Sequence, residues 1–257
     1  MIKIADNKIK SEFKSHFIKK MKDENFITFF YNIFTLGTAY IVGGFFRDFL
    51  YDNPSRDIDI LVDIKNEELF QILKELDLKH SVNRHGGVKI KLRNIEADIW
   101  SIENNWAFKN KLVKLNEDDK LNSIAKGCFY NYDSLVINLN SFNYILRYYK
   151  EFVDSKKLNI LQERTIYKHL NPSIEANILR AFYIKQKYKI QYTINTQKYL
   201  NSKLGHLWDK YGNPIERLLE VKRTYSKYNS VDKSTIENYI LELKGNISST
   251  SPGLFDY

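Results

Sequence analysis

Residues 40–50 read Tyr40-Ile41-Val42-Gly43-Gly44-Phe45-Phe46-Arg47-Asp48-Phe49-Leu50, and residues 56–62 read Arg56-Asp57-Ile58-Asp59-Ile60-Leu61-Val62. The first run predicts a short apolar strand that ends at a diglycine turn and passes directly into a helix. The second run predicts a strand, because acidic and apolar residues alternate in it. Alternate residues of a strand point to the same face, so Asp57 and Asp59 share one face of this strand.

The shared face of Asp57 and Asp59 concentrates negative charge. Two carboxylates held close together repel each other unless a positive charge lies between them. Mg²⁺ takes oxygen ligands and often bridges carboxylates to the phosphates of a substrate. Backbone N–H groups of a glycine-rich turn can bind such phosphates. The two runs therefore predict a magnesium-dependent, nucleotide-binding enzyme with Gly43 and Gly44 at its phosphate-binding turn.

A third carboxylate follows on a predicted hairpin. Strand-like runs cover residues 88–92 and 95–100, and Asp98 alternates with its apolar neighbours in the second run. If this second strand lies beside residues 57–62, then Asp57, Asp59 and Asp98 converge. Three convergent carboxylates suit a site for two Mg²⁺ ions that activates a hydroxyl for phosphoryl or nucleotidyl transfer.

The pattern changes from mixed to helical along the chain. We predict an α+β fold, with a catalytic head over residues 1–145 in which helices flank a small mixed β-sheet. A basic, all-helical region follows over residues 146–257. Its predicted helices, with the helical segment that opens the head, cover residues 1–36, 173–189, 195–204, 214–228 and 234–244.

Positive charge is concentrated in the second half of the chain. Residues 1–140 carry 21 Lys and Arg against 20 Asp and Glu, whereas residues 141–257 carry 19 against 11. This asymmetry is typical of a protein in which one half holds a polyanion and the other modifies it. A lysine-rich composition without a nucleic-acid partner explains it equally well.

A predicted helix over residues 180–192 interleaves basic and aromatic side chains. Lysines on this helix would bind RNA phosphates while tyrosines stack on unpaired bases. Aromatic residues at helical spacing are more often part of a core, so only the lysines are predicted RNA contacts. These are Lys185, Lys187 and Lys189.

Composition and cysteine count indicate the class of protein. The apolar fraction of 43% and the charged fraction of 28% are ordinary for a soluble globular chain. Cys128 is the single cysteine and cannot form an internal disulfide. The five histidines show no paired ligand spacing, so zinc is not predicted. We expect a soluble, cytoplasmic protein.

The run over residues 40–50, followed by residues 56–59, resembles the head domain of class II tRNA nucleotidyltransferases and bacterial poly(A) polymerases. These enzymes belong to the DNA polymerase β-like nucleotidyltransferase superfamily. The family pattern V-G-G-x-x-R-D-x-L, a short gap and D-x-D is matched at each position. His85-Gly86-Gly87-Val88-Lys89-Ile90 is similar to the family's H-G-T-V-T-V strand, and residues 177–182 are similar to the start of its neck helix. The resemblance covers roughly residues 25–190.

The resemblance implies roles for individual residues. It implies catalytic acids that hold two Mg²⁺ ions at Asp57, Asp59 and Asp98. It implies nucleotide-binding positions at Gly43, Gly44, Arg47, Asp48, Arg56 and Arg180. For Asp48, a structural salt bridge is as consistent with the sequence as a direct contact with the nucleotide.

Three departures from the family pattern concern base selection. The family's R-R-D-F-T-I-N-A-L-A segment falls near residues 127–136, where both arginines and the aspartate are absent and Asp133 stands for the asparagine. The neck motif E-D-x-x-R falls near residues 173–177 and is not kept in register. Glu103 replaces the arginine that usually closes the strand of the third carboxylate. We therefore expect catalysis to be retained, base selection to be altered and ordered C-C-A addition to be absent.

The leading functional hypothesis is a magnesium-dependent transfer of a nucleotide from a nucleoside triphosphate to an RNA 3′ end, with tRNA as the first candidate acceptor. A housekeeping end-repair enzyme and a specialised, toxin-like relative both fit it. One alternative keeps the chemistry but places the nucleotide on a protein or small-molecule hydroxyl. Another is a catalytically silent module that binds nucleic acid or regulates a partner.

Overall fold

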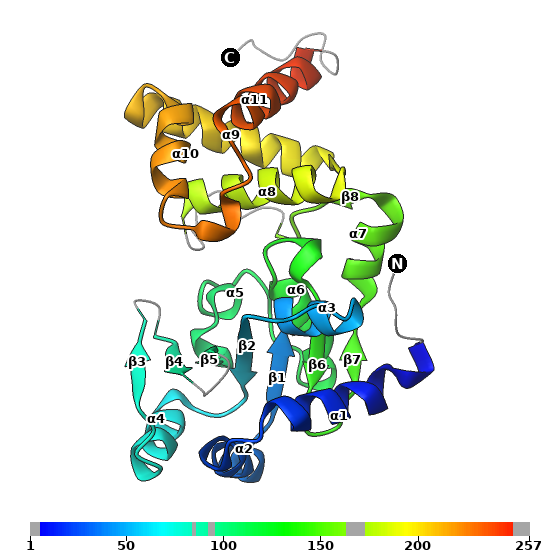
Figure 1. Cartoon of the computed structure of the whole chain (residues 1–257), viewed down its shortest axis with the longest axis vertical. Coiled ribbons are helices and arrows are strands. Elements are labelled where there is room, and N and C mark those ends of the chain that lie inside the picture. Colours follow the sequence, from blue (N-terminus) through cyan, green and yellow to red (C-terminus); the bar gives the residue numbers. More distant parts are fainter. Residues whose placement is uncertain (1–5, 84–85, 92–95, 163–172, 249–257) are drawn as a thin grey trace. The chain divides into compact units, whose positions relative to one another are not determined.

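A computed structural model of the chain describes residues 6–83, 86–91, 96–162 and 173–248. The chain divides into two compact units, residues 1–150 and residues 151–257. The N-terminal unit contains a mixed β-sheet flanked by helices, and the C-terminal unit is built mainly of helices (Figure 1). This agrees with the predicted α+β class.

A seven-stranded sheet forms the centre of the N-terminal unit, with the strand order β3-β4-β5-β2-β1-β6-β7. The neighbours β2 and β5 pair in parallel, and the other neighbouring strands of this sheet pair antiparallel. The predicted hairpin is therefore present as β4 and β5. The strands are β1 (Ala39–Val42), β2 (Asp57–Val62), β3 (His80–Val82), β4 (Val88–Lys91), β5 (Glu96–Ser101), β6 (Val136–Asn138) and β7 (Tyr144–Ile145).

Alternation along β2 and β5 separates a buried face of the sheet from a face that carries acids. Ile58, Ile60, Ala97 and Ile99 are fully buried. Each fully buried isoleucine side chain stabilises the fold by about 1.5–3 kcal/mol. Since a shift of one residue in register would expose all four, the hydrophobic pattern fixes which face of these strands presents the carboxylates.

Helices pack on this sheet and on one another. Helix α2 contacts β1 and α4, α4 contacts β5, and α3 contacts both β1 and β2. The ring of Phe13 on α1 packs edge-on against Phe46 and Phe49 of α3, at centroid distances of 5.1 and 5.0 Å. The helices of this unit are α1 (Ile9–Lys20), α2 (Glu24–Leu36), α3 (Gly44–Leu50), α4 (Asn66–Glu75), α5 (Trp106–Lys109), α6 (Lys120–Gly127) and the first part of α7 (Arg147–Ser155), with 3-10 turns η1 (Asp6–Lys8), η2 (Ile102–Asn104), η3 (Glu117–Asp119) and η4 (Asn131–Asp133).

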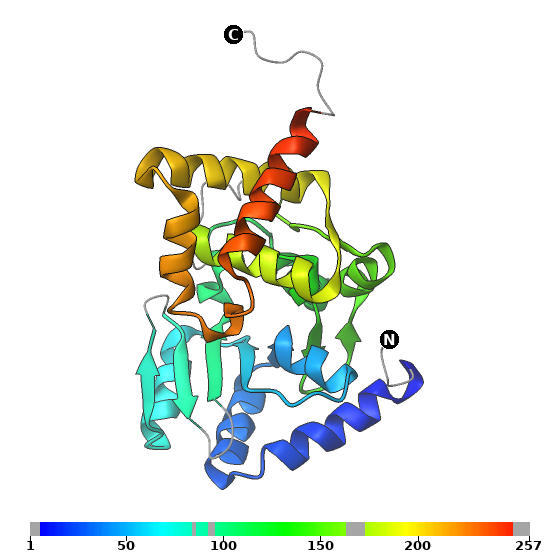
Figure 2. The same cartoon turned by 45° about the horizontal axis from the view of Figure 1, so that its top comes forward.

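Four longer helices make up most of the C-terminal unit. Helices α10 and α11 each contact α8 and α9 (Figure 2). A side chain caps the start of each of them; for example, Ser173 Oγ accepts from the Ala176 N–H at 3.1 Å and Asp232 Oδ1 accepts from the Thr235 N–H at 2.8 Å. The helices are α8 (Ile174–Tyr188), α9 (Ile194–Tyr211), α10 (Pro214–Lys222) and α11 (Lys233–Ser248), with the 3-10 turn η5 (Ser226–Tyr228).

Several details of this unit differ from the sequence prediction. Helix α8 ends at Tyr188, four residues before the end of the helix predicted over residues 180–192. Helix α9 continues to Tyr211, seven residues beyond the predicted end at residue 204, and α10 ends at Lys222 instead of residue 228. A parallel pair of two-residue strands, β8 (Lys157–Leu158) and β9 (Gln191–Tyr192), joins two segments that are distant in sequence. Strands of this length are too short to leave an alternating pattern. In the part of the chain that the structure describes, no helix is both long and apolar enough to cross a bilayer.

Candidate active site

The acids predicted from the sequence lie on two neighbouring strands. In the parallel pairing of β2 with β5, Asp59 is opposite Asp98 and Asp57 is opposite Glu96. Residues directly opposite each other on neighbouring strands project from the same face of a sheet. Asp57, Asp59 and Asp98 therefore share one face at adjoining positions, as expected if the hairpin strand lies beside the Asp57–Val62 strand.

Two cations face these acids. Arg56 Nε donates to Asp57 Oδ2 at 3.1 Å. Lys89 on β4 lies directly opposite Asp98, and its Nζ is 3.3 Å from Asp98 Oδ2 and 3.3 Å from Glu96 Oε2. Lys89 was not among the predicted site residues, although the alternation of the hairpin strand would have placed it on the same face as Asp98.

Among the acids that pair with Arg56 and Lys89, Asp98 is the most buried. Its side chain is 18% exposed, against 42% for Asp57. Burial raises the pKa of the Asp98 carboxyl above its usual value, and the Lys89 ammonium lowers it by a smaller amount. The negative charges of Asp57 and Glu96 raise this pKa further. Local charge therefore favours a cation beside Asp98.

The donor set fits a divalent cation by its chemistry. Carboxylate oxygens are the ligands that Mg²⁺ prefers, and three of them share this face. Among the described residues, however, no group of three His, Cys, Asp or Glu side chains is arranged to hold a metal ion. Asp57 and Asp98 are instead turned toward Arg56 and Lys89. Binding of a cation to all three acids thus requires these side chains to leave their present ion pairs.

The diglycine turn connects β1 to α3. Gly43 has a φ of +74°, a backbone conformation that residues with a Cβ rarely adopt. Its N–H donates to Leu135 O at 2.8 Å, and a Cβ at this position would lie 3.4 Å from the carbonyl oxygen of Asp133. The turn is therefore packed against the segment that contains η4 and the start of β6.

Arg47 on α3 reaches the same segment. Its Nη1 lies 3.6 Å from Asp133 Oδ1, and its Nη2 lies 3.8 Å from Asp48 Oδ1. The guanidinium carbon is 4.2 Å from the centre of the Tyr132 ring, which favours the cation through the electrons of the ring face. Arg47 is thus oriented by Asp133 and Tyr132, which the sequence did not indicate as site residues. The only signal was that Asp133 stands in place of an asparagine of the resembling family.

Residues 39–122 match the family model described as the Poly A polymerase head domain. Over this stretch the chain is similar to the head domain of poly A polymerases. The stretch includes the diglycine turn, Arg47 and the three acids. No curated protein sequence matches the chain.

Solved structures with the same fold include "The complex structure of CCA-adding enzyme with ATP", with 17% identity and a TM-score of 0.54, and the corresponding complex with CTP, with 17% identity and a TM-score of 0.53. A third is the apo form I of CCA-adding enzyme, with 16% identity and a TM-score of 0.53. Each match covers 85% of this chain and 54% of the other. The chain therefore spans about half the length of these structures, and the likeness at this identity is one of fold.

Within the head domain, two predicted nucleotide-binding residues have structural contacts. Ser55 Oγ donates to Asp48 Oδ2 at 3.3 Å, and the Asn53 N–H donates to Asp48 O at 2.9 Å. Asp48 therefore stabilises the turn between α3 and β2, which supports the structural reading of this residue. The side chain of Arg56 is 71% exposed beside Asp57. His85 of the hairpin motif lies outside the described residues.

The remaining predicted positions lie on α8 or, for Lys189, directly after it, in the C-terminal unit. Arg180 is half-buried there, and Lys187 and Lys189 are exposed. Lys185 differs from the prediction, because its side chain is only 11% exposed and its Nζ lies 2.9 Å from Glu242 Oε1. Its Nζ is also 5.0 Å from the centre of the Tyr192 ring. The ion pair joins α8 to α11 and the ring contact joins α8 to β9, so the Lys185 ammonium is engaged within this unit. Lys187 and Lys189 are the more exposed of the predicted RNA contacts.

Proposed function

We propose that the chain transfers a nucleotide from a nucleoside triphosphate to the 3′ end of an RNA, with tRNA as the first candidate acceptor, in a reaction that depends on Mg²⁺. The observation that carries this proposal is the register of β2 and β5, which sets Asp59 opposite Asp98 and beside Asp57. The head-domain match and the shared fold with CCA-adding enzymes solved with ATP and CTP support it.

Each part of the head domain would have a distinct task. The acids Asp57, Asp59 and Asp98 would hold the magnesium ions, whose charge would favour ionisation of the attacking hydroxyl and balance the charge on the departing pyrophosphate. The turn at Gly43 and the Arg47 guanidinium would bind and orient the triphosphate. The 3′ hydroxyl of the acceptor would lie near Asp98 and lose its proton as its oxygen bonds to the α-phosphorus. The bond from that phosphorus to pyrophosphate would then break.

The acceptor is proposed from charge. Residues 151–257 carry 17 Lys and Arg against 11 Asp and Glu. An excess of positive charge strengthens binding to a nucleic-acid backbone because it releases counterions. The exposed Lys187 and Lys189 are candidates for this contact. An RNA acceptor also favours a cytoplasmic location.

Base selection is proposed to differ from that of an ordered C-C-A-adding enzyme. Asp133 and Glu103 replace an asparagine and an arginine of the resembling family. Glu103 has a structural task here, because its Oε1 accepts from the Asn66 N–H at 2.8 Å at the start of α4. A carboxylate at the first turn of a helix stabilises that helix. We propose that the enzyme adds nucleotides without a fixed C-C-A order.

One assay tests the proposal. The purified chain is incubated with Mg²⁺, tRNA and each α-labelled nucleoside triphosphate in turn. The double variant Asp57→Ala, Asp59→Ala serves as the control. Label on the RNA 3′ end that is absent with the double variant supports the proposal. Label on protein would indicate a protein acceptor instead, and absence of label with all four triphosphates would indicate a catalytically silent module.

A further inference from the structure

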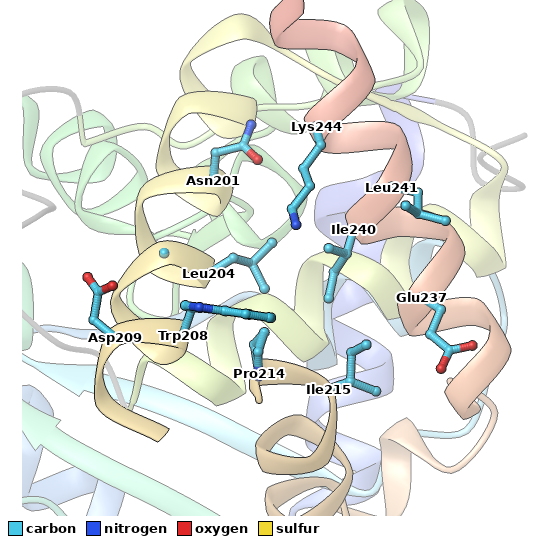
Figure 3. Close-up of a pocket in the computed structure, with 11 residues that line it drawn as sticks. Asn201, Leu204, Trp208, Asp209, Pro214, Ile215, Glu237, Ile240, Leu241 and Lys244 are labelled. Carbon is cyan, nitrogen blue, oxygen red and sulfur yellow. The ribbon is translucent and has the colours of Figure 1, made fainter. Parts of the chain in front are cut away.

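A cavity of about 660 Å³ lies within the C-terminal unit, between α9, α10 and α11 (Figure 3). Its walls are largely apolar and include Leu204, Pro214 and Ile240. Cavities of roughly 300–1,000 Å³ are typical of sites for small organic ligands. The dimensions therefore suit a ligand of the size of a nucleotide.

A tryptophan forms one side of this cavity. Trp208 on α9 is 57% exposed, and Leu241 across the cavity on α11 is 65% exposed. In Figure 3 the indole is seen edge-on between Leu204 and Pro214, and it extends from α9 toward α11. Large apolar side chains that remain exposed around a cavity are typical of a binding site.

A glycine keeps the same wall open. Gly205 lies inside α9 and lines the cavity. Glycine inside a helix costs about 1 kcal/mol relative to alanine. No packing constraint requires it here, because a Cβ built on Gly205 would have no neighbouring atom within 4 Å. The absence of a side chain instead leaves space beside Trp208.

A single cation faces the tryptophan among the residues that line the cavity. Lys244 Nζ lies 5.7 Å from the centre of the Trp208 ring, near the outer limit of about 6 Å for a cation–π contact. Figure 3 shows its side chain extending from α11 toward the indole, whereas the Asp209 carboxylate points away from the cavity. A flat ring stacked on the indole would therefore lie close to a positive charge.

We propose that this cavity binds one unpaired base of an RNA, with the base stacked on Trp208 and an adjacent phosphate bound by the Lys244 ammonium. Stacking on an aromatic side chain accepts any base, and a lysine beside it recognises the backbone. Asn201 is positioned to accept from the edge of a base, since its Nδ2 already donates to Leu243 O at 3.3 Å and its carbonyl oxygen remains as the acceptor. The excess positive charge of this unit favours an anionic polymer over an apolar peptide. The inference rests on the proposed function, because it assigns a contact to the acceptor RNA.

Binding without catalysis provides the test. An unstructured oligoadenylate is titrated into the ¹⁵N-labelled chain, and the indole N–H resonances of Trp100, Trp106 and Trp208 are followed. We expect the Trp208 resonance to shift. Trp208→Ala and Gly205→Leu should each raise the dissociation constant at least about fivefold, since stacking contributes about 1–3 kcal/mol per base. Lys244→Gln should reduce the salt dependence of binding by roughly one phosphate contact.

Gly245→Leu is the matched control, because this glycine also lies inside a helix, α11, and a Cβ there has no neighbour within 4 Å. It does not line the cavity, so binding should remain unchanged. Equal affinities of Gly205→Leu and Gly245→Leu would overturn the inference, as would a Trp208 resonance that stays in place at saturating RNA. Equal affinity for AMP and oligoadenylate would indicate a free-nucleotide site and would overturn the RNA assignment.

The two proposals fail separately. If tRNA is labelled in the transfer assay while Trp208 does not respond to RNA, the inference about the cavity is wrong and the proposed function stands. If Trp208 responds to RNA while no acceptor is labelled, the proposed function is wrong and the RNA site stands.

Discussion

Arg47 Nη1 lies 3.6 Å from Asp133 Oδ1, so the arginine that follows the diglycine turn is held by an acid from η4. The side chains of Arg47 and Asp133 are 15% and 12% exposed, and their charges are only partly screened by water. An incoming triphosphate would have to compete with Asp133 for Arg47. If the proposed function holds, the carboxylate at residue 133 would therefore weaken the binding of a nucleotide.

Asp133→Asn should strengthen nucleotide binding. The asparagine keeps a carbonyl oxygen near Arg47 but removes the competing negative charge. Removal of one such charge is worth about 1 kcal/mol, which corresponds to roughly a fivefold lower dissociation constant. Calorimetry with a non-hydrolysable triphosphate measures this dissociation constant. Glu12→Gln on α1 also removes one negative charge, so it controls for the change in net charge. Weaker binding by Asp133→Asn would mean that Asp133 orients Arg47 productively.

Asp98→Asn should stabilise the metal-free chain at neutral pH while abolishing transfer. Burial raises the pKa of the Asp98 carboxyl, so the ionised carboxylate destabilises the folded chain. The stability that the protonated carboxyl contributes is fully present below the unfolded pKa of 3.8 and is lost as the pH rises through the folded pKa. Asparagine removes this loss, and the variant's advantage should vanish below about pH 3.8. Urea unfolding with a chelator, from pH 3 to pH 8, gives the comparison. A less stable variant at pH 7 would contradict this expectation.

Lys89→Met should lower the magnesium concentration needed for transfer. The Lys89 ammonium is 3.3 Å from Asp98 Oδ2 and would compete with a metal ion for that oxygen. Half-maximal activity should therefore require several-fold less Mg²⁺, and chelation should abolish the activity of both proteins. Lys91→Met is the matched control, because Lys91 lies on the same strand but opposite Glu96. An equal response of the two variants would show only a general effect of charge.

Local patterns made the core of the candidate site predictable. The alternation in Asp57–Val62 and around Asp98 fixes which face carries the acids, and the hairpin signal brings Lys89 next to Asp98. The partners of Arg47 could not be predicted in this way, because Tyr132 and Asp133 lie on a segment distant in sequence that packs against Gly43. The ion pair of Lys185 could likewise not be predicted from sequence, since its partner Glu242 lies on another helix. Contacts between segments far apart in sequence leave no periodic pattern.

Gly43→Ala should reduce both stability and transfer. The positive φ of Gly43, +74°, costs an alanine about 1–3 kcal/mol. The added Cβ would lie in contact with the Asp133 carbonyl oxygen, so a backbone that shifts to relieve this φ would disturb the segment that orients Arg47. Gly212→Ala is the matched control, because Gly212 has a similar φ of +72° but ends α9 with no atom within 4 Å of a Cβ.

Urea unfolding and transfer rates at a temperature where both variants are folded separate the two effects. Both variants should lose stability, and only Gly43→Ala should lose transfer. A folded Gly43→Ala variant with an unchanged rate and an unchanged affinity for triphosphate would exclude the turn from phosphate binding. Because the N–H of Gly43 already donates to Leu135 O, that result would leave the turn a purely structural link between β1 and β6.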